Sequence, residues 1–161
     1  MKTTWISDIL EGKHDGQKVE LKGWIKRSRG SNKIRFVVLR DSTGSIQCVA
    51  KKDAVGEECF ENVKSALIES SLIIHGLANP DERADGGYEI IVQDVEIVGP
   101  VNPDTPFPIT ESAMVAADGG ETEFLLDNRH LYLRTTRMTT MLKLRSCLLY
   151  TSDAADESVS V

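Results

Sequence analysis

The sequence predicts a small β-barrel of five strands, in the all-β or α+β class, with one helix between the third and fourth strands. Three observations in the first hundred of the 161 residues carry this prediction. Residues 19–50 alternate apolar and polar side chains in three short runs, residues 53–70 change to helical spacing, and residues 72–98 return to alternation. A period of two indicates strands with one buried face, whereas a period near 3.6 indicates a helix.

The first three strands are expected at residues 19–26, 34–39 and 46–50. Turn-forming residues separate them at 29–33, which reads RGSNK, and at 41–44, which reads DSTG. Such short connections join neighbouring antiparallel strands, so the three runs form a meander.

The predicted helix at residues 53–70 is followed by strands at 72–77 and 88–98. In the last strand the apolar side chains change parity between Val92 and Val95, which predicts a bulge. A five-stranded barrel with a helix between strands three and four is the OB-fold, which binds oligonucleotides across strands two and three. A barrel whose charges are merely solvated remains the simpler alternative.

The charge is uneven along the chain. Ten Lys and Arg and two acidic residues between Lys18 and Lys52 give about +8, whereas the whole chain is −6. A positive sheet on an acidic protein favours binding of a polyanion such as nucleic acid.

The composition also excludes several classes of protein. No run approaches the roughly 18 apolar residues that span a membrane. The N-terminus has no apolar signal core, so we expect a cytoplasmic protein. Cys48, Cys59 and Cys147 have no CxxC spacing and the histidines lie far apart, so no disulfide framework and no metal site are expected.

Beyond the predicted barrel domain, residues 1–100, the chain changes character. Residues 101–120 contain three prolines and are expected to form a linker. Residues 121–146 return to helical spacing and are expected to contain a hinge and the beginning of a second domain.

Five stretches between residues 19 and 134 form a series. They read VELKGWIKRSR, IRFVVLRDSTGSIQCV, GGYEIIVQDVEIV, PFPIT and EFLLDNRHLYLR. In this order they resemble the N-terminal region of the asparaginyl-tRNA synthetases, which are class IIb aminoacyl-tRNA synthetases. The resemblance implies an OB-fold domain that binds the tRNA anticodon loop, then a hinge and the truncated start of a class II catalytic domain.

The resemblance further implies roles for individual residues. In the family an aromatic side chain on strand two stacks on the central anticodon base, and Phe36 matches that position. Gln47 matches a glutamine that reads a base edge, and Glu89 matches an acidic residue lining the same pocket. Splayed single-stranded bases suit this kind of recognition, because a protein can stack them and reach their edges.

Basic residues are expected to hold the RNA phosphates, namely Arg27 and Arg29 at the end of strand one, together with Arg35. A second interpretation of the residues stays open, in which Phe36 is a core aromatic of the barrel and the charged side chains are only solvated.

The chemistry that the resemblance implies belongs to the full-length parent. Such enzymes use ATP and Mg²⁺ to join asparagine to tRNA, and they are homodimers. The family's catalytic motifs lie beyond the end of this chain, so we assign it no catalytic residue, cofactor or metal and expect it to be inactive and not dimeric.

Two alternatives remain at this stage. The first is an aspartyl-tRNA synthetase, including forms that charge both tRNAs, because the two families share this domain. The second is a free-standing OB-fold module that binds single-stranded nucleic acid without catalysis.

The end of the chain differs from what precedes it. The resemblance stops at Ser146, and residues 147–161, CLLYTSDAADESVSV, do not continue the apolar spacing. CLLYTSDAADE resembles a translated sequencing adapter, so we expect residues 147–161 to be a non-native tail.

Overall fold

The computed structural model describes residues 4–109 and 122–157 of the chain. The chain separates into two compact units, residues 1–107 and 108–161. The last strand of the first unit ends at Gly99, beside the predicted domain boundary at residue 100. Residues 110–120 of the predicted linker lie outside the described residues.

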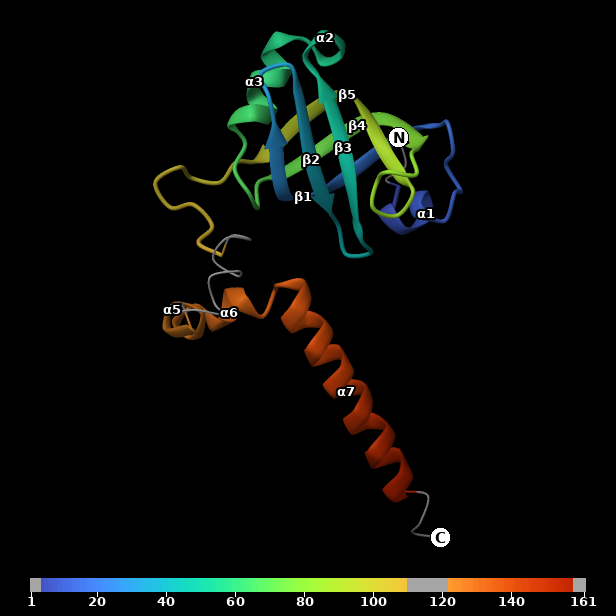
Figure 1. The fold of residues 1–161 in the computed structure, drawn as a ribbon, viewed down its shortest axis with the longest axis vertical. Coiled ribbons are helices and arrows are strands. Elements are labelled where there is room, and N and C mark those ends of the chain that lie inside the picture. Colours follow the sequence, from blue (N-terminus) through green and yellow to red (C-terminus); the bar gives the residue numbers. More distant parts are fainter. Residues whose placement is uncertain (1–3, 110–121, 158–161) are drawn as a thin grey trace. The chain divides into compact units, whose positions relative to one another are not determined.

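The first unit is a closed barrel with the strand order β1-β2-β3-β5-β4 (Figure 1). All neighbouring strands are antiparallel except β3 and β5, which are parallel. This order confirms the predicted OB-fold. The strands are β1 (Lys18–Gly30), β2 (Ile34–Arg40), β3 (Ser45–Lys51), β4 (Ser71–Pro80) and β5 (Tyr88–Gly99).

The core of the barrel consists of the inward side chains that the alternation predicts. On β1 these include Val19, Leu21 and Ile25, which are at most 3% exposed. Gly23 occupies the remaining inward position of this run, where a Cβ atom would collide with the Arg40 carbonyl oxygen of β2. The close approach of the two backbones therefore requires glycine.

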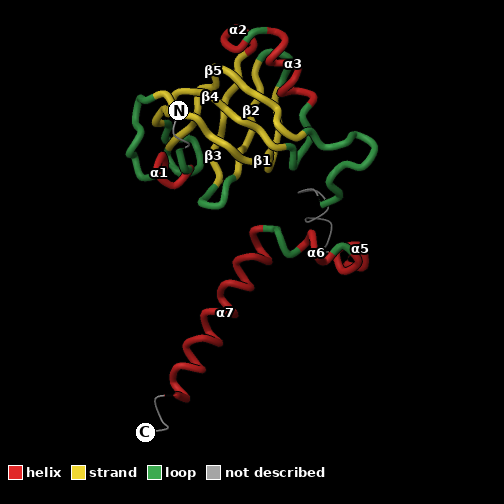
Figure 2. The backbone as a smooth tube through the Cα atoms, turned by 180° about the vertical axis from the view of Figure 1, so that it is seen from behind, coloured by secondary structure: helices red, strands yellow, loops and turns green. Residues whose placement is uncertain are grey.

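Helices cover the two ends of the barrel (Figure 2). Helix α1 (Ile6–Leu10) covers one end with Ile6 and Ile9, both fully buried. Helices α2 (Lys52–Val55) and α3 (Glu57–Ser65) lie at the other end, where Phe60 and Val63 are buried.

The prediction of one helix over residues 53–70 was wrong in its extent. Gly56 has φ of +82°, which interrupts the helix between α2 and α3. The helix ends at Ser65, and Glu69 adopts a left-handed φ of +71° before β4 begins.

Both long strands carry a bulge. On β5, Gly76 pairs with Val92 and His75 pairs with Asp94, so Gln93 is the extra residue. This position confirms the bulge that the parity change between Val92 and Val95 predicts. On β1 the extra residue is Lys26, which the sequence pattern does not indicate.

The second unit is helical in its described part. It contains α5 (Thr122–Asp127), α6 (Arg129–Tyr132) and α7 (Thr136–Glu157). Helix α7 continues through Ser146, and its side chains from Thr140 to Thr151 are all exposed. The suggested non-native origin of residues 147–161 stays a prediction. No helix in the described part of the chain is long and apolar enough to cross a membrane.

Candidate nucleic-acid interface

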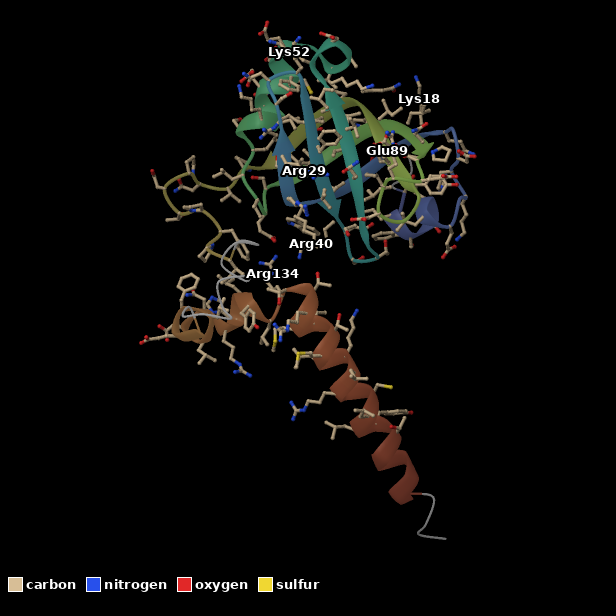
Figure 3. All side chains as sticks on the ribbon, in the orientation of Figure 1. Lys18, Arg29, Arg40, Lys52, Glu89 and Arg134 are labelled. Atoms are coloured by element: carbon tan, nitrogen blue, oxygen red, sulfur yellow. The ribbon has the colours of Figure 1, made fainter. Side chains whose placement is uncertain are left out.

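The basic residues of the first three strands do not form one surface. Figure 3 shows Lys18, Arg40 and Lys52 at separate places around the barrel. Several are also engaged in ion pairs. Arg40 contacts Glu69 at 2.9 Å, and Lys52 contacts Glu57 at 2.6 Å. The positive sheet that the sequence predicts is therefore divided, and the position of each cation decides whether it can reach RNA.

The bulge at Lys26 directs two arginines outward. Before the bulge, Ile25 faces Leu39 inside the barrel. After it, Arg27 pairs with Val38 and Arg29 pairs with Phe36, so both arginines share the outer face of β2. Without the extra residue, the alternation on β1 would place them toward the core.

Phe36 lies on this outer face and does not belong to the core. Its strand neighbours Val37 and Leu39 are buried at 2% and 0% exposure, whereas Phe36 is only partly buried. The Arg29 guanidinium lies 5.6 Å from the centre of the Phe36 ring, within cation–π range. Because Arg29 is exposed, the guanidinium can move aside and leave the ring to a flat base.

Gln47 and Glu89 extend the same face across β3 and β5. Gln47 pairs with Val38 on one side and with Glu89 on the other. Gln47 is diagonal to Phe36, at a spacing of about 7–8 Å that long side chains can bridge. We call the outward side chains of Arg27, Arg29, Phe36, Val38, Gln47 and Glu89 the Phe36 face; Arg29 and Glu89 are labelled in Figure 3.

Arg35 does not join the Phe36 face. Its guanidinium donates to the Ser28 hydroxyl and to the Lys64 carbonyl of α3, each at 3.4 Å. Its Nε atom is buried without a hydrogen-bond partner. As a neighbour of Phe36 in the sequence, it faces the other side of β2, so its position corresponds to a structural role.

Two polar residues were missed by the sequence interpretation. Asn79 of β4 donates to Glu89 Oε1 at 3.5 Å and so helps to fix that carboxylate. Lys51 pairs with Ile34 on the same outer side of β2 and β3 as Phe36. The parity of β3 could have indicated Lys51, because it lies four residues beyond Gln47.

Cys48 lies beneath the Phe36 face and is inert. Burial raises its pKa to about 12, because the apolar interior disfavours the thiolate. Across residues 4–109 and 122–157, no cluster of His, Cys, Asp or Glu side chains could hold a metal ion.

Comparison with known proteins agrees with the fold. Residues 19–98 match the family described as tRNA_anti-codon, an OB-fold nucleic acid binding domain. The chain is 41% identical over 143 residues to the asparagine–tRNA ligase of Thermoplasma acidophilum, covering 89% of this chain and 31% of that protein. A ligase of the same name from Symbiobacterium thermophilum is also 41% identical, over 142 residues.

A solved structure also matches this chain over most of its length. Asparaginyl-tRNA synthetase from Pyrococcus horikoshii, in complex with asparaginyl-adenylate, superposes with a TM-score of 0.77 at 35% identity. The match covers 96% of this chain and 34% of that one. The chain thus spans about a third of the length of these relatives. It belongs to the asparaginyl-tRNA synthetase family, of which it contains the OB-fold nucleic acid binding domain.

Proposed function

We propose that the barrel binds the anticodon loop of tRNA(Asn) on the Phe36 face, as part of an asparagine–tRNA ligase. The observation that carries the proposal is the alignment of Arg29, Phe36, Gln47 and Glu89 on four neighbouring strands. One base stacks on Phe36, and this contact contributes about 1–3 kcal/mol. Arg27, Arg29 and Lys51 contact phosphates.

Gln47 and Glu89 supply the specificity of the site. The Gln47 amide offers a donor and an acceptor, which suits the edge of a pyrimidine. The Glu89 carboxylate, held by Asn79, accepts from a base N–H or amino group. Edge contacts select the sequence, whereas phosphate contacts set position and total affinity.

The parent reaction joins asparagine to tRNA(Asn) with ATP, and we place that activity and its dimerisation in the full-length protein. No described residue of this chain is assigned to ATP or Mg²⁺. A cytoplasmic location follows from the same proposal, because the substrate tRNA is used there in translation.

Titration of labelled anticodon stem-loops, followed by fluorescence anisotropy, tests the function. The chain should bind a tRNA(Asn) stem-loop more tightly than one with an altered central base. Gln47→Ala should reduce this preference more than total affinity. Gln93→Ala, an exposed glutamine at the β5 bulge, is the matched control.

Three outcomes decide between the alternatives. Equal loss of affinity for both loops in Gln47→Ala would contradict the assigned role of Gln47. Equal binding of tRNA(Asn) and tRNA(Asp) stem-loops would favour a non-discriminating aspartyl enzyme. Equal binding of any single strand would favour a general OB-fold module.

A further inference from the structure

A pocket of about 470 Å³ opens on the barrel, and no residue of the Phe36 face lines it. Among the described residues of the barrel unit, the large apolar side chains that are clearly exposed are Trp5, Trp24 and Val98, and all three line this pocket. Trp5 is 49% exposed and Trp24 is 47% exposed. Such a concentration of exposed apolar surface marks a binding site.

The pocket and the Phe36 face lie along the same strand. Trp24 pairs with Arg40 on β2, and the next outward pair beyond the Lys26 bulge is Arg27 with Val38. Trp24 also pairs with Ser71 on β4, which forms the other side of the pocket. Trp24 and Arg29 are five positions apart on β1, which corresponds to about 17 Å of strand, so one RNA strand can reach both sites.

The lining of the pocket suits a flat aromatic ring. Exposed indoles stack nucleobases, and the pocket volume lies within the usual range for small-molecule sites. Asp41 is the acidic residue of the lining, but both of its carboxylate oxygens accept hydrogen bonds from within the protein. Lys22 also lines the pocket, and its half-exposed ammonium pairs with Glu20 at 3.3 Å.

The size of the patch argues against a protein partner. A stable protein interface buries about 800 Å² on each side, whereas the exposed apolar side chains here number three. A single nucleobase, in contrast, needs only the surface of one aromatic ring on which to stack.

We propose that the Trp5–Trp24 pocket binds a second nucleobase of the same RNA, outside the bases that contact the Phe36 face. The proposal rests on the proposed function, because it extends the same RNA along β1. The pocket adds affinity by stacking and makes little distinction between bases, since every base offers a flat face.

The chain contains only two tryptophans, and both line the pocket, so intrinsic tryptophan fluorescence reports on this site alone. Unlabelled tRNA(Asn) stem-loop should quench the emission of the full chain in proportion to binding, which anisotropy of labelled RNA measures independently. Trp5→Phe and Trp24→Phe assign the quenching to each indole.

Affinity provides the second measurement. Trp24→Ala should weaken stem-loop binding by about 5- to 150-fold, as expected for the loss of one stacked base. Trp24→Phe retains a flat ring and should change affinity by less than about threefold. Val98→Ala is the matched control in the same pocket, because it removes apolar surface without removing a stacking ring.

The outcomes separate this inference from the function on which it rests. If the stem-loop binds and Phe36→Ala weakens it, but emission and Trp24→Ala affinity are unchanged, the pocket proposal alone is wrong. If emission depends on protein concentration, with a dimer in sedimentation, the pocket belongs to a protein contact and the proposal also fails. If no stem-loop binds to the chain, both the pocket proposal and the proposed function are wrong.

Discussion

Phe36 and Leu39 lie on one short strand and face opposite sides of it, so their substitutions should have opposite effects. Phe36→Ala should weaken stem-loop binding by about 5- to 150-fold, through loss of one stacked base. It should change stability little, because the ring lies outside the core. Leu39→Ala, in the fully buried neighbour, should lower the free energy of unfolding by about 2–5 kcal/mol.

The measurements are anisotropy for affinity and urea denaturation for stability. If Phe36→Ala unfolds the barrel while Leu39→Ala does not, the assignment of the two faces of β2 is reversed.

Arg29 and Arg35 form a second contrasting pair. Arg29→Ala should lower RNA affinity, and it should reduce the slope of log K against log salt concentration by about 0.7, the value for one phosphate contact on a single strand. Arg35→Ala should lower stability by about 0.5–1.5 kcal/mol, because it removes the hydrogen bonds to the Ser28 hydroxyl and the Lys64 carbonyl. Its effect on RNA affinity should be smaller than that of Phe36→Ala.

Salt titrations of both variants, together with thermal melts, measure the contrast. If the salt slope changes in Arg35→Ala and not in Arg29→Ala, then Arg35 contacts the RNA phosphates and Arg29 does not.

The sequence predicted part of this face for a clear physical reason. Phe36 differs in parity from the buried Val37 and Leu39, so alternation alone indicates its outward position. The same parity places Arg35 inward, and its hydrogen bonds to Ser28 and Lys64 agree with that position. The positions of Arg27 and Arg29 depend on the Lys26 bulge, which a single extra residue creates without a pattern of its own.

At the scale of elements, the β2–β3 turn holds helix α1 in place. Asp41 accepts hydrogen bonds from the backbone N–H groups of Ile6, Thr43 and Gly44, at 2.6–3.0 Å. The Thr43 hydroxyl in turn accepts from the Ser7 N–H at 3.1 Å. The turn therefore supplies the acceptors that the short helix cannot provide at its own N-terminus.

Asp41→Ala should lower the free energy of unfolding by about 1–3 kcal/mol, the cost of leaving these donors unpaired. Asp41→Asn retains one acceptor oxygen and should lose less. The matched control is Asp53→Ala, an exposed aspartate in the first turn of α2. The stability of the three variants is compared by their denaturation midpoints. Equal midpoints for Asp41→Ala and Asp53→Ala would contradict the claim that the β2–β3 turn stabilises α1.

Element boundaries were predicted less well than element types. The sequence indicated a helix over residues 53–70, but the glycine at position 56 and the left-handed Glu69 divide and shorten it. Helical spacing of apolar residues persists across such a break, because each short helix packs against the same barrel end. The bulge on β5 was predicted, since apolar residues lie on both sides of it and display the change in parity.

At the scale of the whole molecule, the separation of its cations sets the salt dependence of RNA binding. If Arg27, Arg29 and Lys51 make three phosphate contacts, log K should fall against log salt concentration with a slope of about −2. Lys18→Ala is the control, because Lys18 lies apart from Arg29 (Figure 3) and is not one of these three cations, so it should leave the slope unchanged. A steep slope of about −6 would mean that the dispersed lysines contribute after all.

The closed strand order has a consequence for how the chain becomes folded during its synthesis. Strand β1 can pair with β4 only after about fifty more residues have been synthesised. Strand β3 can pair with its parallel neighbour β5 only after β5 has emerged. Pairings this distant in sequence make folding slow, on the order of milliseconds to seconds for all-β domains. On the ribosome, the β1–β2–β3 meander therefore emerges as an incomplete sheet with two open edges. These edges are exposed to misassociation until residues near Ile91 leave the exit tunnel and close the barrel.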